Sequence, residues 1–203
     1  MLHGDVATGY SKGFELRSDH FLQNVKMKLR TFKTAWPHID DSAYVDPQAS
    51  VIGNVVIGPD SSVWPMTVIR GDVNHIRIGA RSNIQDGSII HVTHPFPARP
   101  QGNAVSIGDD VTIGHRVVIH GCTIGNECLI GIGAIILDGA VLQDRVLLGA
   151  GSLVTEEKVL ESGYLYLGSP ARQVRALSKD EIKWFKYSAD HYVQLKNDHL
   201  VSV

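Results

Sequence analysis

The chain has 203 residues, a formal net charge of −2 and 43% hydrophobic residues, which suits one domain with a short appendage. Acidic and basic residues are mixed without a long run of either sign, which argues against binding to nucleic acid or to an anionic membrane surface. Because no apolar run approaches the roughly 20 residues of a membrane span, we expect a soluble, cytoplasmic protein with neither of these partners.

Residues 1–26 contain no apolar centre of a signal peptide, and acidic residues interrupt any transit-peptide pattern. The repeats described below begin well after Met27. We therefore expect residues 1–26 to form a flexible extension, which need not be native and to which we assign no function.

Aliphatic residues recur every six positions over most of the chain. This period is interrupted three times: by three extra residues after Ile69, by an irregular segment at residues 91–103 and by a slip of one residue after Ile113. A period of six fits neither a helix nor simple strand alternation, but it suits a coil of short strands whose aliphatic residues stack inward. We expect this coil to cover about residues 44–154. Its periodic residues are Val45, Val51, Ile57, Val63, Ile69, Ile78, Ile84, Ile90, Ile107, Ile113, Ile124, Ile130, Ile136, Leu142, Leu148 and Val154.

The repeats resemble the hexapeptide signature of left-handed parallel β-helices, in which three hexapeptides form one triangular turn. Residues 162–174 contain Gly and Pro and indicate a linker, after which Ser178 and Glu181 form a capping box at the start of a helix. An apolar stripe on this helix predicts that it packs outside the coil. We assign residues 27–170 to a left-handed β-helix domain and 171–203 to a C-terminal helical appendage. The stripe consists of Ile182, Phe185, Ala189, Tyr192 and Val193.

Three histidines, His91, His115 and His120, lie inside the regular coil. His91 and His120 each follow an inward isoleucine, so their side chains point outward. They are 29 residues apart, one turn of 18 plus 11, and a loop at residues 91–103 can supply the excess. The two would then lie one above the other, about 4.8 Å apart. His115 falls near a coil corner and faces away from the other two histidines, so a third ligand has to come from an adjacent protomer. Three imidazoles with an open fourth position form a catalytic zinc site.

The motifs IRGDV (69–73), NIQDGSIIH (83–91) and IGHRVVIHGCTIG (113–125) are similar to those of the γ-class carbonic anhydrase-like hexapeptide proteins, especially the bacterial YrdA-like branch. The similarity covers roughly residues 39–203. This resemblance implies a homotrimer with metal sites between subunits. His91 and His120 would come from one subunit and His115 from the next. Zn²⁺ is the expected ion, and Fe²⁺ or Co²⁺ would also suit three imidazoles.

The resemblance also assigns roles to polar residues. Arg70 and Asp86 match a charge-assisted bridge across the trimer interface, and Asn83 matches a polar residue that supports it. Gln85 matches a pocket glutamine that hydrogen-bonds the metal-bound hydroxide or bicarbonate, and Asp72 matches a carboxylate near the metal. Without the motifs, surface ion pairing would be the first interpretation of these charges.

Two features depart from the family's well-established carbonic anhydrases. Val73 stands where those enzymes carry a glutamate that assists hydration, and the loop at 91–103 contains no acid where they carry a glutamate that shuttles protons. His94 is the local candidate for proton transfer, because imidazole titrates near neutral pH, although a loop histidine without this role fits equally well. Tyr164 or Tyr166 is a candidate for positioning the water.

The first hypothesis is therefore a zinc-dependent lyase of the carbonate dehydratase type, in which metal-bound hydroxide attacks CO2 to give bicarbonate, with activity that can be weak or cryptic. One alternative is metal-dependent hydrolysis of an acyl-CoA thioester or another small acyl compound. Two others are a CoA-dependent acyltransferase with a histidine base and a non-catalytic trimeric scaffold. Metal removal would leave the acyltransferase active and would dissociate the scaffold.

Overall fold

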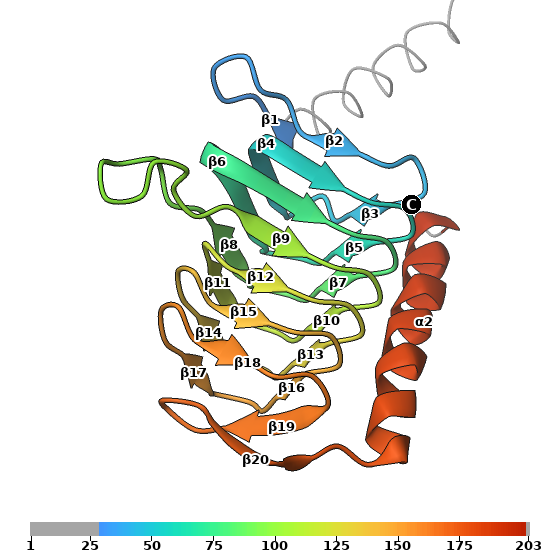
Figure 1. Cartoon of the computed structure of the whole chain (residues 1–203). Coiled ribbons are helices and arrows are strands. Elements are labelled where there is room, and N and C mark those ends of the chain that lie inside the picture. Colours follow the sequence, from blue (N-terminus) through green and yellow to red (C-terminus); the bar gives the residue numbers. More distant parts are fainter. Residues whose placement is uncertain (1–28, 202–203) are drawn as a thin grey trace, which may run out of the picture.

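The computed structural model describes residues 29–201, so the extension expected at residues 1–26 lies outside the described part. Residues 29–201 form a left-handed parallel β-helix with one helix, α2 (Lys179–Val201), alongside it (Figure 1). The predicted fold class is confirmed. Within these residues, no helix is long and apolar enough to cross a membrane.

The coil has three faces, which we name A, B and C. The long strands β4 (Ser50–Ile57) and β6 (Val68–Ile78) bend from face A into face B. Face A continues with β1 (Leu29–Arg30), β8 (Ile89–His91), β11 (Val118–His120), β14 (Ile135–Ile136) and β17 (Leu153–Val154). Face B continues with β2 (His38–Ile39), β9 (Val105–Ile107), β12 (Thr123–Ile124), β15 (Val141–Leu142) and β18 (Val159–Leu160). Face C contains β3 (Tyr44–Val45), β5 (Ser62–Val63), β7 (Asn83–Ile84), β10 (Thr112–Ile113), β13 (Leu129–Ile130), β16 (Leu147–Leu148), β19 (Tyr164–Leu167) and the antiparallel β20 (Arg172–Ala176).

The core is a column of stacked aliphatic side chains inside the coil. On face A, Ile69, Ile90 and Ile119 are paired in register, and each is fully buried. All sixteen periodic residues predicted to point inward belong to this core, so the six-residue period is confirmed. Each buried aliphatic side chain contributes about 1.5–3 kcal/mol of hydrophobic stabilisation.

The coil is longer than residues 44–154 at both ends, so that boundary was wrong. β1 and β2 pair with β4 before the first predicted repeat, and β18 and β19 continue after the last. The predicted linker at residues 162–174 is instead a rung and an antiparallel strand. Tyr166 pairs with Leu148 at the next inward position and is only 3% exposed. The six-residue period did not reveal this rung, because an aromatic residue occupies the position that is aliphatic in the other rungs.

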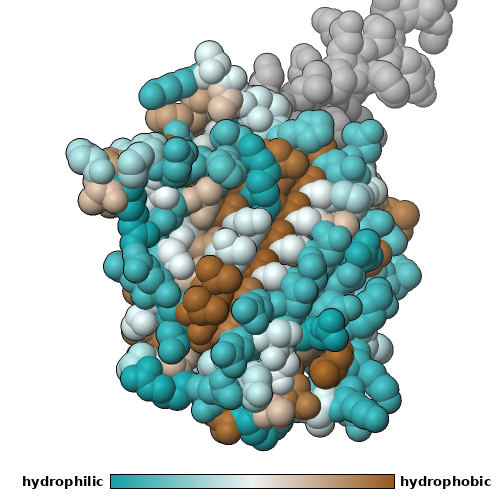
Figure 2. Space-filling view, in the orientation of Figure 1, coloured by the Kyte–Doolittle hydropathy of each residue, from teal (hydrophilic) through white to brown (hydrophobic). Residues whose placement is uncertain are grey.

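The outward residues differ between the faces. On face B the outward positions run from His38 and Val56 through Arg77 and Ser106 to Val159. Figure 2, which looks onto this face, shows hydrophobic residues crossing its middle with hydrophilic surface on both sides. The outward residues of face C lie beneath α2. On face A, by contrast, an in-register aliphatic column remains partly exposed. It consists of Val68, Ile89, Val118, Ile135 and Leu153.

Helix α2 begins with the predicted capping box and packs on face C. Ser178 N donates to Glu181 Oε2 at 2.8 Å, and Glu181 N donates to Ser178 Oγ at 3.2 Å. Phe185 and Ala189 of the predicted stripe are fully buried. A buried lysine that the stripe did not include, Lys196, places its Nζ 2.8 Å from Asp60 Oδ1 on the coil.

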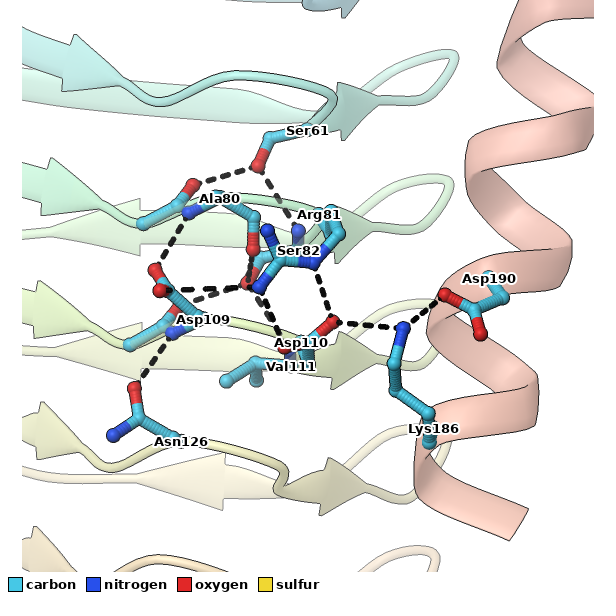
Figure 3. A network of polar contacts seen from close by, with 12 residues as sticks. Ser61, Ala80, Arg81, Ser82, Asp109, Asp110, Val111, Asn126, Lys186 and Asp190 are labelled. Carbon is cyan, nitrogen blue, oxygen red and sulfur yellow. Dashed lines mark hydrogen bonds and ion pairs between the residues drawn. The ribbon is translucent and has the colours of Figure 1, made fainter. Parts of the chain in front are cut away.

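A polar network at the corner between faces B and C also holds α2 (Figure 3). Arg81 donates to both carboxylate oxygens of Asp110, at 2.8 and 2.7 Å. Lys186 Nζ of α2 lies 3.7 Å from Asp110 Oδ1. The hydrogen bond from Arg81 is the main reason that the pKa of Asp110 lies below its usual value.

Replacing Asp110 with asparagine is expected to lower the free energy of unfolding by about 1–3 kcal/mol at pH 7, because the bidentate charged hydrogen bond is lost. Since the folded pKa of Asp110 is depressed, the contribution is present above an unfolded value of about 3.9 and disappears as the pH falls below it. Urea unfolding at pH 7 and at lower pH measures this change. The matched variant Asp109→Asn changes an exposed carboxylate and should have little effect; an equal loss in both variants would contradict the prediction.

Candidate metal centre

His91 and His120 end two neighbouring strands of face A. His91 is the last residue of β8, His120 is the last residue of β11, and the two are paired in register. His91 Nδ1 lies 3.1 Å from His120 Nε2. The predicted stacking of the two histidines is therefore confirmed, and the loop between them has the length that the 29-residue interval requires.

The outer nitrogens of both rings contact carboxylates. His91 Nε2 lies 3.0 Å from Asp72 Oδ1, and His120 Nδ1 lies 2.5 Å from Asp138 Oδ1. Asp72 also accepts a hydrogen bond from Arg70. Burial alone would raise the pKa of Asp72 and of Asp138, but their hydrogen bonds outweigh it and hold both pKa values below the usual range. Both carboxylates are therefore charged at neutral pH and accept N–H groups from the rings.

These contacts fix the tautomers and thereby the direction of the lone pairs. Because each outer nitrogen carries the proton, His91 Nδ1 and His120 Nε2 hold lone pairs that face one another. Burial lowers the pKa of His91, which disfavours a second proton on its ring. The 3.1 Å separation is close to that of two nitrogens bound to one ion at about 2.0–2.1 Å each. The residues present thus fit a divalent metal.

His115 lies at the opposite edge of face A. It follows β10 at the corner between faces C and A, and its Nδ1 lies 2.9 Å from Asp86 Oδ2. Within residues 29–201 of one chain, no group of three His, Cys, Asp or Glu residues is placed to hold a metal ion. The structure brings His91 and His120 together and leaves His115 apart, so its role as third ligand stays a prediction about the assembly.

The predicted bridge between Arg70 and Asp86 is not formed within one chain. Arg70 pairs with Asp72 beside His91, whereas Asp86 pairs with His115 at the other corner. A contact between Arg70 and Asp86 would have to cross a subunit interface, and it also stays a prediction.

Asn83 and Gln85 lie in a buried polar row on face C. Gln85 Nε2 donates to Asn83 Oδ1 at 3.1 Å, and Asn83 Nδ2 donates to Thr112 Oγ1 at 3.0 Å. Thr112 Oγ1 in turn lies 2.9 Å from Ser188 Oγ of α2. Within the chain this row connects the coil to α2 and does not approach the histidine pair. The predicted roles of Asn83 at an interface and of Gln85 near substrate therefore need a partner subunit as well.

The remaining candidates lie apart from the histidine pair. His94 is exposed on the loop, with its ring centroid 5.9 Å from that of Phe96. Tyr164 and Tyr166 lie on β19, three strands along face C from β10, or roughly 14 Å along the coil at a strand spacing of about 4.8 Å. Neither tyrosine is brought to His120, which lies in the turn of β10.

Asp72 and Val73 line a shallow cavity of about 260 Å³ beside the pair, together with His75 and the hairpin at residues 32–35. Val73 is 40% exposed. An aliphatic side chain thus lines this cavity at the position where the resemblance leads one to expect a glutamate.

Sequence reasoning missed Asp138, the carboxylate that holds His120. Asp138 Oδ2 also accepts a hydrogen bond of 2.6 Å from Thr93 Oγ1, and Thr93 pairs with Asn103 across the base of the loop. Asp138 follows His120 by 18 residues, which is one regular turn. The sequence signal for this contact was the interval itself, because a residue that follows another by one full turn lies next to it on the same part of the coil.

Replacing Asp138 with asparagine is expected to weaken zinc binding about 10–100-fold. The amide nitrogen of asparagine can donate to His120 Nδ1, which would move the ring proton to Nε2 and remove the lone pair. Asp144→Asn is the matched control, since Asp144 Oδ1 only accepts the backbone N–H of Asn126 at 2.7 Å and asparagine keeps that acceptor. Competition with a chromophoric chelator measures both affinities. Unchanged zinc affinity in the Asp138 variant would contradict this role.

Several known proteins are similar to this chain. The family model for the bacterial transferase hexapeptide (six repeats) matches residues 121–156. The chain is 52% identical to protein YrdA of Escherichia coli over 85% of its own length and 94% of that protein. It is 40% identical to the mitochondrial gamma carbonic anhydrase 1 of Arabidopsis thaliana over 92% of its own length and 69% of that protein. A solved Bacillus cereus structure described as an acetyltransferase has a TM-score of 0.79 and 37% identity, and the match covers 85% of this chain and 96% of that one. The chain belongs to the γ-carbonic anhydrase-like family of hexapeptide-repeat proteins.

Proposed function

We propose that this protein is a metal-dependent enzyme that hydrates CO2 to bicarbonate. The observation that carries the proposal is the in-register pair His91 and His120, whose outer nitrogens are held by Asp72 and Asp138. The similarity to a plant gamma carbonic anhydrase supports the same reaction. A divalent metal, for which we propose zinc with Fe²⁺ or Co²⁺ as alternatives, would supply a Lewis acid that ionises water near neutral pH.

We further propose that the active assembly is a homotrimer in which His115 of the partner subunit completes the site. The aliphatic column of face A supports this, because Ile89 is 46% and Ile135 is 38% exposed in the single chain, and such a surface is typical of an interface. His115 lies at one edge of this face, and the pair lies at the other. In a closed ring of three subunits, each interface joins one edge of face A in one subunit to the other edge of face A in the next.

The other side chains of the site have supporting roles in this proposal. Asp72 and Asp138 hold the two rings in the tautomer that leaves a lone pair for the metal. Arg70 keeps the Asp72 carboxylate charged. His94 lies in the exposed loop that begins just after His91, where its ring can accept a proton and release it to solvent.

Stopped-flow CO2 hydration by zinc-loaded protein tests the proposal, with the chelated and the reloaded protein as controls. We expect acceleration above the buffer rate that disappears on chelation and returns with zinc. Protein loaded with Fe²⁺ or Co²⁺ under anaerobic conditions extends the comparison. A trimer that retains metal but gives only the buffer rate with all three ions would contradict the enzymatic proposal.

The second candidate function is a CoA-dependent acetyltransferase, because the Bacillus cereus structure described in this way is 37% identical to the chain. Such an enzyme needs a histidine with one free ring nitrogen as a base. Thiol release from acetyl-CoA in the presence of an amine or alcohol acceptor would support it if chelation leaves the rate unchanged. Release that depends on metal and needs no acceptor would instead indicate a thioesterase.

A further inference from the structure

Helix α2 carries exposed aromatic rings that no part of residues 29–201 covers. Trp184 is 56% and Tyr187 is 59% exposed, and their ring centroids lie 4.9 Å apart. His191 stacks on Tyr187 with the rings 10° from parallel. We name Trp184, Tyr187 and His191 the aromatic stripe. Stacked aromatic side chains of this size are typical of a binding surface, because they offer a large apolar area with little side-chain entropy to lose.

The contacts of α2 show which way the stripe faces. Lys186 points to the corner between faces B and C, where it reaches Asp110. At about 100° per residue, Trp184 and His191 lie on the opposite flank of the helix, toward the corner between faces C and A, and Tyr187 lies beside them on the outward side.

The stripe also lies at the height of His115. Ser188, one residue after Tyr187, contacts Thr112 of β10 at 2.9 Å, and His115 follows directly after β10. The stripe is therefore next to the edge of face A that, in the proposed trimer, meets His91 and His120 of the partner subunit.

The loop at residues 92–104 begins immediately after His91 and projects from the coil between β8 and β9 (Figure 1). It is a preformed hairpin, because Thr93 pairs with Asn103 and Phe96 pairs with Arg99. Asn74 Nδ2 further donates to two carbonyl groups at its base, at 3.1 and 2.8 Å. The loop presents Phe96, 36% exposed, between two prolines.

We infer that the loop of one subunit docks on the aromatic stripe of the next, so that α2 closes one side of the shared metal site. This inference rests on the proposed trimer. If His91 of one subunit lies beside His115 of another, the chain that continues from His91 must pass the edge where the stripe lies. Subunits of a threefold ring whose axis follows the coil keep equivalent turns at equal height, so the base of the loop at His91 lies one turn from β10, the strand that Ser188 contacts. The Phe96 ring and its flanking prolines are apolar and can pack against the exposed rings of the aromatic stripe.

Cross-linking in the zinc-loaded full chain tests this contact. We expect the double variant Phe96→Cys/Tyr187→Cys, treated with a short bismaleimide, to give covalently linked dimers and trimers on a denaturing gel. Cys122 and Cys128 are at most 2% exposed, and burial raises the pKa of both thiols, so they should not react. The control pair Phe96→Cys/Val174→Cys uses an exposed residue of β20 at the end of the coil and should remain monomeric on the gel. Linked products from Tyr187→Cys alone would place two helices together and would overturn the inference.

Tryptophan fluorescence provides a second readout. Trp36 is 51% exposed and Trp64 is 5% exposed, so in a Trp36→Phe background Trp184 is the exposed tryptophan. We expect Trp184 to be shielded from iodide in the trimer, and we expect Phe96→Asp to raise its quenching constant at least about twofold by removing the cover. A metal-binding trimer with no cross-link and a freely quenched Trp184 would overturn the inference and leave the proposed function intact. A chain that stays monomeric with zinc would overturn both.

Discussion

Replacing His91 with alanine is expected to lower zinc affinity by at least about 100-fold and to reduce CO2 hydration to the buffer rate. Removing only an outer partner of a ligand costs about 10–100-fold in affinity, and this change removes the ligand itself. It also leaves Asp72, which is 13% exposed, without one of its two hydrogen-bond partners. Elemental analysis after dialysis and stopped-flow hydration measure the two effects.

His38→Ala is a suitable control for this variant, because His38 is exposed on β2 and lies on face B. It should retain zinc and activity. Thermal unfolding followed by circular dichroism should show that both variants keep the coil, since the inward isoleucines beside His91 are unchanged. Full zinc retention by the His91 variant would contradict the assignment of this metal site.

Replacing Gly121 with alanine is expected to destabilise the protein by about 2–4 kcal/mol, combining left-handed backbone strain with a lost, partly buried hydrogen bond, and to weaken zinc binding about tenfold or more. Gly121 has a φ of 53°, and a Cβ atom there would lie 2.3 Å from Asp138 Oδ1 and 2.7 Å from the Cβ of Asn103. The substitution therefore pushes Asp138 away from His120. Urea unfolding and chelator competition on the same preparations measure both losses.

Gly133→Ala isolates the steric part of this prediction. Gly133 is also a corner glycine, with a φ of 69°, but a Cβ atom there would meet nothing within 4 Å. Only the left-handed backbone cost of about 1–2 kcal/mol should appear, with zinc affinity unchanged. Equal effects of the two substitutions would contradict a specific contact between Gly121 and Asp138.

The coil and the histidine pair were predictable from the sequence because both follow from one repeat length. Inward residues of one face recur by whole turns of 18, and once the loop at residues 91–103 takes up the 11 extra residues, Ile90 falls next to Ile119 and His91 next to His120. The rule failed where a rung changed its residue type. Tyr166 fills the inward position of the last rung, but an aromatic residue does not belong to an aliphatic series.

The parts that escaped prediction depend on contacts between segments that no period relates. Lys196 is buried against Asp60 across the gap between α2 and the coil, and amphipathic spacing cannot identify a buried lysine. Asp138 was accessible in principle, one turn after His120, but a carboxylate near a histidine becomes informative only when both side chains are known to point the same way. The role of His115 as third ligand stays a prediction, because the partners proposed for it, His91 and His120, would lie on another subunit.

The antiparallel strand β20 limits the length of the molecule. A stack of parallel rungs has no geometric reason to end, and a bare last rung would offer its unpaired N–H and C=O groups to the first rung of another molecule. On face C, β20 occupies that position with the opposite chain direction and is exposed along its whole length. Arg175 ties it to Glu181 at the start of α2 with hydrogen bonds of 2.8 and 2.7 Å. The reversed direction of this one strand thus favours a molecule of fixed length over end-to-end growth into a fibre.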